Sequence, residues 1–226
     1  INVVSLANNH TLDWGSEGLL DTMSRLKEAG LPYVGVGQNL AQARQPVVLE
    51  RNGTRVGFLA YGCIGPDGYE AEEEKPGYAP VRSWTIYEKV DYQPGTPPRI
   101  VSLPYKEDLA AMVQDIHQLK AQVDVAVISF HWGQHFVPRV IPMYCFDIGH
   151  AAVDAGADLI LGTHAHILKG IEVYKGKVIF YSTSNFALEL GQGTLKGKSM
   201  PKVFRKFIEH YGFAPDPEYP TYPMHP

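Results

Sequence analysis

Three short segments of this 226-residue chain place histidine or asparagine directly after an apolar run. Residues 6–10 read Leu-Ala-Asn-Asn-His, residues 128–131 read Ile-Ser-Phe-His, and residues 161–166 read Leu-Gly-Thr-His-Ala-His. Imidazole nitrogens and amide oxygens both bind divalent metal ions. In an open α/β sheet the carboxyl ends of the strands face one crevice, where binding sites are built. The three segments together therefore predict one metal-binding cluster.

His164 and His166 lie two residues apart, so in an extended segment their side chains point the same way and can bind one ion or two adjacent ions. Gly162 is expected to let the backbone turn tightly ahead of them. Each piece alone has an ordinary alternative: His131 can be a core histidine, and residues 9–10 can form an Asx turn. Their joint occurrence at three strand ends favours the metal site.

These segments require a sheet flanked by helices. Apolar spacing predicts helices near residues 16–29, 41–44, 109–116 and 144–155, with Ser16 capping the first and Gly30 ending it. Apolar runs predict strands at residues 1–6, 33–34, 46–50, 55–61, 123–130, 158–161, 171–174 and 178–181. We expect residues 1–6 to be buried, and Asn52-Gly53 to turn a hairpin. Alternation of strand and helix predicts an α/β fold with parallel pairing.

Composition indicates one soluble domain without a nucleic-acid or membrane partner. The net charge is -4, and no apolar run reaches the roughly 18 residues that cross a bilayer. Residues 62–99, rich in Gly, Pro and acidic residues, predict a surface excursion that can form the rim of a site. Because Ile1 already lies in a predicted strand, we expect the natural protein to begin earlier, with any anchor or export signal upstream.

Four motifs resemble, in order and spacing, those of the CapA/PgsA-type poly-γ-glutamate capsule biosynthesis proteins. They are residues 7–10 with Asp13 and Gly15, His-Trp-Gly at 131–133, residues 162–166, and residues 181–186. That family is similar to the calcineurin-like metallophosphoesterases. The resemblance covers residues 1–190 and implies a metallophosphoesterase-like α/β sandwich of mixed sheets flanked by helices, with its first strands upstream of Ile1. Residues 191–226 are not covered; we expect a helix near 202–211 and a Pro/Tyr-rich tail.

The resemblance also implies roles for individual residues. Asn9, His131, His164 and His166 would be metal ligands, and His10 would donate a proton or stabilise transition-state charge. The family holds two divalent ions, of the Mn, Fe or Zn type, which carry a hydroxide for attack on phosphorus. Its carboxylate ligands are expected upstream of Ile1, so an ion bound by this chain alone would be single, loosely held or absent.

Three further residues are candidates around the ligands. Asp13 is expected either to orient His10 or to favour the start of the first helix. His135 stands where the family usually carries Glu, and that substitution predicts a contact with metal or substrate. Asn185 is expected to face the site from the end of its strand and to bind substrate.

Two functions follow from the resemblance, both in the cell envelope. The first is a metal-dependent hydrolase of poly-γ-glutamate or capsule polymer biosynthesis, with phosphoesters as the first substrate class. The second is a non-catalytic component that binds the anionic polymer, or other subunits, within a synthesis or export complex. A third possibility is a degenerate member of the family, whose histidines hold only a structural metal ion.

Overall fold

The computed structural model describes residues 1–137 and 139–185 of the chain. The helix expected near residues 202–211 and the tail of residues 191–226 lie outside the described residues. Within the described part, no helix is both long and apolar enough to cross a bilayer.

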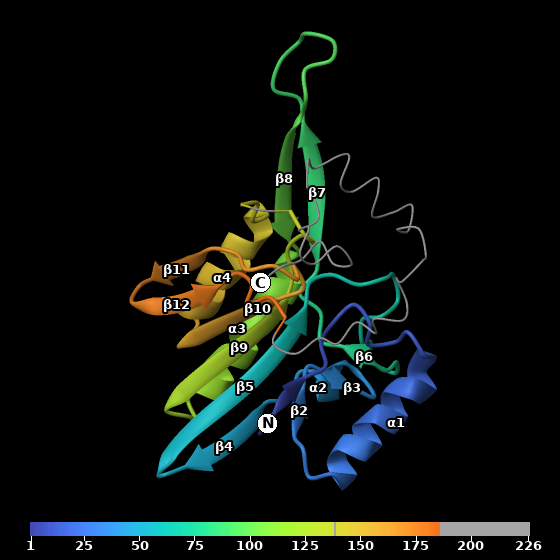
Figure 1. The fold of residues 1–226 in the computed structure, drawn as a ribbon, viewed down its shortest axis with the longest axis vertical. Coiled ribbons are helices and arrows are strands. Elements are labelled where there is room, and N and C mark those ends of the chain that lie inside the picture. The colour runs from blue at the N-terminus through green and yellow to red at the C-terminus, as the bar shows by residue number, and fades with distance from the viewer. Residues whose placement is uncertain (138, 186–226) are drawn as a thin grey trace, which may run out of the picture.

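A six-stranded mixed sheet organises the chain and confirms the predicted α/β class (Figure 1). Its four central strands are parallel, and an antiparallel strand closes each edge. The predicted hairpin is confirmed, and Asn52 and Gly53 adopt the positive φ angles of a tight two-residue turn. The predicted strands at residues 171–174 and 178–181 form a second hairpin. In spatial order the strands are β11 (Ile171–Tyr174), β12 (Lys177–Phe180), β10 (Leu159–Thr163), β9 (Val125–His131), β5 (Thr54–Gly62) and β4 (Val47–Arg51).

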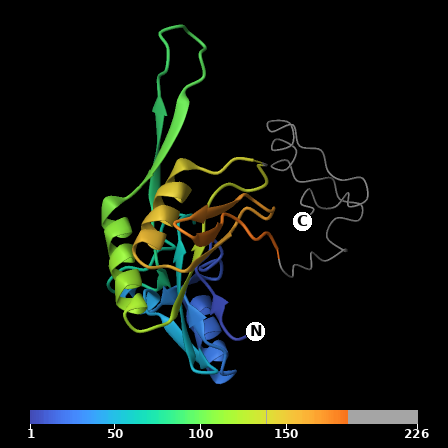
Figure 2. The same cartoon turned by 90° about the vertical axis from the view of Figure 1, so that its left-hand side faces the viewer.

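The two faces of the sheet are covered by different elements. Helices α3 (Lys106–Lys120) and α4 (Met143–Asp154) lie on one side, and the N-terminal elements lie on the other (Figure 2). Ile128 and Phe130 of β9 join the core with the helices, because alternate residues of a strand face opposite sides. His131 therefore faces the N-terminal elements.

The N-terminal layer consists of β1 (Val4–Ser5), β2 (Tyr33–Val34) and α1 (Gly15–Glu28). β1 and β2 form their own parallel pair outside the six-stranded sheet. The prediction of a buried strand over residues 1–6 is therefore wrong: within the part of the chain that the structure describes, β1 pairs with β2 alone, and Ile1 is 94% exposed. This layer packs on β5 through a second apolar cluster that includes Ala7 and Ala60.

Helix α1 differs from the sequence prediction at its start. Trp14 occupies the N-cap position without a side-chain hydrogen bond, and Ser16 lies inside the first turn. The predicted cap by Ser16 is wrong because the helix begins one residue before it, at Gly15, whose φ is +68°. The predicted end is confirmed, because Gly30 follows the helix with a φ of +65°.

Residues 62–99 are more ordered than the sequence predicts. β7 (Ser83–Glu88) and β8 (Arg99–Pro104) form an antiparallel hairpin that projects from the body (Figure 1). Most of β7 is exposed, which confirms the surface location for this part of the segment. Tyr78, Ala79 and Val81 are buried in the core, so the surface prediction is wrong for them. The hairpin is regular although the sequence of residues 62–99 shows no sustained periodicity: Trp84 pairs with Leu103 and Ile86 with Val101 across it. The remaining elements are β3 (Val36–Gly37), α2 (Leu40–Ala43) and β6 (Gly77–Tyr78).

Gly162 serves close packing rather than a turn. It lies inside β10, and its φ is not in the left-handed region, so the predicted tight turn is wrong. A Cβ at this position would lie 2.4 Å from the backbone oxygen of Tyr181 and 2.5 Å from Nε1 of Trp132. Glycine thus lets the fully buried Trp132 and the end of β12 approach the strand that leads to His164.

We predict that Gly162→Ala lowers the free energy of unfolding by about 1–3 kcal/mol, because the added methyl group overpacks the core. Urea denaturation measures the change. Gly170→Ala is the control: its Cβ would meet Ile141 at an ordinary 3.5 Å, so we expect a change within about 0.5 kcal/mol. Equal effects of the two substitutions would contradict the packing role of Gly162.

Candidate metal centre

The loop that follows β1 is held by the side chains of Asn8 and Thr11, not by that of Asn9. Asn8 Oδ1 accepts a hydrogen bond from the His10 amide at 2.8 Å, which makes the Asx turn of this segment. The Thr11 hydroxyl donates to the backbone oxygen of Leu6 at 2.7 Å and closes the loop. The turn therefore uses Asn8, and Asn9 extends toward the sheet.

Asn9, His131 and His164 meet at one point, as the sequence predicts. Asn9 Oδ1 lies 2.7 Å from Nε2 of His131, and Nδ1 of His164 lies 3.1 Å from the same atom. Since the amide oxygen can only accept, Nε2 of His131 carries the proton. Two acceptor atoms, from the segment after β10 and from the loop after β1, thus face one N–H group at the end of β9.

Thr163 allows His131 to exchange this tautomer. Its hydroxyl lies 3.0 Å from Nδ1 of His131 and 3.3 Å from the backbone oxygen of Phe130. It can donate to Nδ1, or accept from a protonated Nδ1 while donating to Phe130. His131 can therefore move its proton to Nδ1 and free Nε2 as a metal ligand, which is the usual arrangement of metal-bound histidine.

The converging atoms fit a divalent ion in type and approximate spacing. Ligand atoms at about 2.0–2.2 Å from one ion lie roughly 3.0–3.5 Å from each other, close to the 2.7 and 3.1 Å found here. In residues 1–137 and 139–185, no three His, Cys, Asp or Glu side chains are grouped to hold an ion as they stand. The convergent set is instead two histidines and one asparagine.

The segment after β10 has a strained backbone. His164 and His166 have φ angles of +86° and +58°, in the left-handed region that non-glycine residues rarely adopt. The prediction that the two side chains point the same way from an extended segment is therefore wrong, because β10 ends at Thr163. Such strain concentrates at functional sites, where the surrounding structure holds it in place.

His166 and Asn185 form a pair beside the convergent set. Nδ1 of His166 donates to Asn185 Oδ1 at 2.7 Å, which leaves its Nε2 with a free lone pair. The structure thus places Asn185 against a predicted ligand, in the position of a group that orients a metal-binding histidine. His135 lies nearby, with its ring 3.8 Å from that of His164 and 5.3 Å from that of His166.

His10 and Asp13 form the exposed side of the site. Nδ1 of His10 donates to Asp13 Oδ2 at 2.7 Å, and Nδ2 of Asn9 donates to Nε2 of His10 at 3.3 Å. Of the two roles expected for Asp13, this geometry favours the orientation of His10 over a role at the start of the helix. Tyr69 donates to the other Asp13 oxygen at 3.2 Å. Sequence reasoning missed Tyr69, because it comes from the excursion, which carried no motif.

Burial keeps the central imidazoles neutral. It lowers the pKa of His131 to about 3 and that of His164 to about 2, and the neighbouring histidines add to the effect. The pKa of His135 falls to about 4 for the same reasons. Neutral imidazole is the form that binds metal, so the site is poised for a cation without first losing protons.

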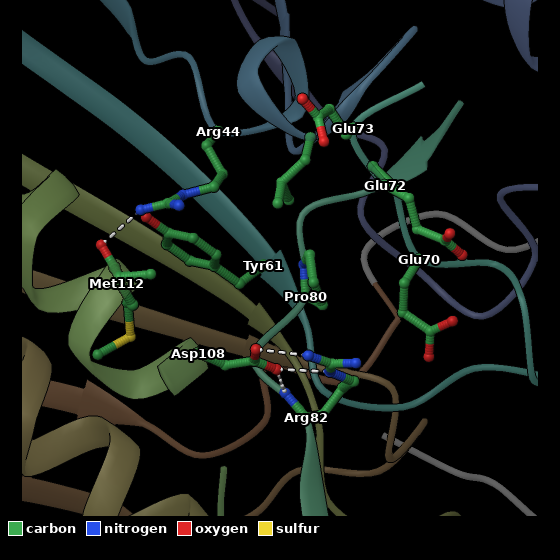
Figure 3. A pocket seen from close by; sticks show the side chains of 12 residues that line it. Arg44, Tyr61, Glu70, Glu72, Glu73, Pro80, Arg82, Asp108 and Met112 are labelled. Carbon is green, nitrogen blue, oxygen red and sulfur yellow. Dashed lines mark hydrogen bonds and ion pairs between the residues drawn. The ribbon is translucent and has the colours of Figure 1, made fainter. Parts of the chain in front are cut away.

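A separate cavity of about 340 Å³ lies between the excursion and α3 (Figure 3). Its walls include Arg44 and Arg82, and it contains none of the predicted site residues. Arg82 donates to both oxygens of Asp108, at 2.7 and 2.8 Å, and Arg44 binds Asp115 in the same bidentate way. These charges are already paired, so the cavity is a weaker candidate than the histidine cluster.

We predict that the metal-free protein loses stability as the pH falls below 6.5. The histidines titrate near 6.5 when unfolded, whereas His131 and His164 stay neutral in the fold down to about 3 and about 2. The unfolded state therefore binds more protons, and the free energy of unfolding falls by roughly 1 kcal/mol per pH unit per histidine. Urea denaturation with a chelator measures this slope, which His164→Gln should reduce. An unchanged slope in the variant would contradict the assignment.

Comparisons with known proteins show the family of this chain. The chain is 31% identical to the capsule biosynthesis protein CapA of Bacillus anthracis over 88% of its length. It is 30% identical over 84% to the PGA biosynthesis protein CapA of Bacillus subtilis. It is 33% identical over 80% to a probable polyglutamine synthesis accessory protein of Mycobacterium tuberculosis. The chain covers 43% of the length of each of these relatives.

The sequence profile of one family matches residues 1–189, which include every predicted site residue. That family is described as bacterial capsule synthesis protein PGA_cap. The match confirms the resemblance seen in the four motifs, and the chain belongs to the PGA_cap family of bacterial capsule synthesis proteins.

Proposed function

We propose that this chain forms the histidine-bearing part of a metal-dependent hydrolase that acts in poly-γ-glutamate capsule biosynthesis. The observation that carries the proposal is the convergence of Asn9 Oδ1 and His164 Nδ1 on Nε2 of His131. The capsule context rests on the family and on the names of its relatives, which describe capsule and polyglutamate biosynthesis. The substrate class is an anionic polymer or a phosphoester.

One group of residues would bind the metal ion, and another would transfer a proton. Asn9, His131, His164 and His166 would hold a divalent cation of the Mn, Fe or Zn type. When bound, the ion supplies Lewis acidity and lowers the pKa of a water molecule. Thr163 and Asn185 each occupy one nitrogen of a ligating histidine, so that the other nitrogen faces the site.

His10 is placed to act on the substrate. Its side chain is 68% exposed, and Asp13 holds its Nδ1 at 2.7 Å. Because Nδ1 is the donor in that contact, Nε2 is the nitrogen that exchanges a proton with solvent or a leaving group. The pair can therefore protonate a leaving oxygen or stabilise negative charge that develops on phosphate.

We predict that the full-length protein hydrolyses bis-p-nitrophenyl phosphate, or its monoester, when Mn²⁺ is added. His164→Ala removes one of the converging donors, and we expect it to lower kcat/KM by at least about 100-fold. Release of p-nitrophenol is the measurement. His117→Ala, on the exposed face of α3, is the control and should retain activity. If the metal-loaded protein turns over no substrate in a broad panel of esters and amides, the hydrolase proposal fails.

One observation favours a second function, that of a non-catalytic polymer-binding or assembly component. Within the described ranges, no three side chains of the usual metal-binding types are grouped to hold an ion as they stand. A platform in a synthesis or export complex needs no catalytic ion.

This second function predicts that full-length protein binds poly-γ-glutamate in a calorimetric titration, and that binding persists in His164→Ala and in a chelator. Binding lost along with the metal would instead favour the hydrolase. An absence of polymer binding by the metal-loaded protein would count against the second function.

A further inference from the structure

The hairpin of β7 and β8 stands clear of the body of the protein (Figure 1, Figure 2). It is a sheet of its own, which no third strand joins within residues 1–137 and 139–185. An isolated two-stranded hairpin is at best marginally stable in water, and three or more strands with an apolar face are needed for independent stability. The outer part of this hairpin therefore needs a further contact.

The outer part of the hairpin is apolar on both faces. Trp84 and Ile86 are exposed on one face. Tyr87 lies on the other face opposite Ile100, and these two side chains are 70% and 61% exposed. Contiguous apolar surface of this kind marks an interaction site on a folded protein. The hairpin is therefore a candidate surface for binding a partner.

The outer edge of the hairpin is β7. On its inner edge, β8 is tied to α4, because the amide of Tyr144 donates to the hydroxyl of the buried Ser102 at 3.3 Å. Natural proteins protect free edges with lysine, proline or a bulge. Residues 83–88 contain no lysine or proline, and their pairing with β8 runs without a bulge. The edge of β7 is thus open to a further strand.

A second copy of this chain meets the requirements for the partner. It supplies a strand with a free edge of its own, which is again β7. The hairpin carries two acidic and two basic side chains, so residues 83–104 have no net charge and two hairpins approach without net repulsion. A two-fold contact between identical edges also closes at two copies, whereas pairing with a different edge would continue into an open assembly.

We propose that two copies of the protein associate through β7, whose two strands pair antiparallel about a two-fold axis near Ile86. The result is a four-stranded sheet in the order β8, β7, β7, β8. Trp84 and Ile86 of both copies then lie on one face of this sheet, and Tyr87 of each copy lies opposite Thr85 of the other. The pairing supplies the additional strands that the hairpin lacks. It goes beyond the proposed function, because it involves no residue of the metal site.

The first test is the mass of the full-length protein by sedimentation velocity over a range of concentrations. We expect the wild type to form dimers. Ile86→Lys places like charges opposite each other near the axis, and we expect it to raise the Kd of the dimer at least about tenfold. Val173→Lys is the matched control, because Val173 is exposed on β11, an edge strand of the six-stranded sheet. This control should leave the Kd unchanged.

Disulfide trapping tests the strand contact directly. In Ile86→Cys two thiols meet near the axis, and oxidised glutathione should link them into a covalent dimer on a non-reducing gel. Val173→Cys should give only background in the same treatment. Cys63 and Cys145 are free in the fold and present in both variants, so the control accounts for them. Circular dichroism checks that each variant is folded.

The outcomes decide between this interface and any other. A wild-type protein that stays monomeric over the whole range would overturn the proposal. A dimer that Ile86→Lys leaves intact, or that Val173→Lys dissociates, would place the interface elsewhere and overturn it as well. If Ile86→Cys forms no covalent dimer above the background of Val173→Cys, the two β7 strands do not pair.

Discussion

The site depends on one meeting point, the Nε2 atom of His131, which Asn9 Oδ1 and His164 Nδ1 approach at 2.7 and 3.1 Å. Three separate parts of the chain supply these atoms: the loop after β1, the end of β9 and the segment after β10. In the proposed metal-bound state, a cation would take the place of the proton on this Nε2 atom. If that proton moves to Nδ1 of His131, the Thr163 hydroxyl can accept a hydrogen bond from it. The exchange therefore needs little rearrangement.

Strand pairing and layer packing bring these three parts of the chain together. Parallel pairing of β9 with β10 sets Thr163 opposite His131, and strand alternation directs both toward the N-terminal layer. The apolar contact of Ala7 and Ala60 holds that layer on β5 and so brings Asn9 within reach. Gly162, without a side chain, lets the core close beneath the strained residues that follow β10.

Much of this follows from sequence, because apolar periodicity and turn residues act locally. The parallel strands and the hairpin at Asn52 and Gly53 were predictable in that way. The approach of Asn9 to His131 was predictable because both follow apolar runs, and the carboxyl ends of strands face one crevice. The left-handed backbone of His164 was not, since the neighbouring chain imposes it against the residue's own preference. Tyr69 reaches Asp13 from 56 residues away, a contact that no local pattern encodes.

The central claim is that Asn9, His131 and His164 share one divalent ion. The most direct test is a crystal structure of the full-length protein grown with Zn²⁺ and measured at the zinc absorption edge. The account predicts an anomalous peak about 2.0–2.2 Å from His131 Nε2, His164 Nδ1 and Asn9 Oδ1. A structure in which Asn9 still hydrogen-bonds His131, with the zinc elsewhere or absent, would contradict it.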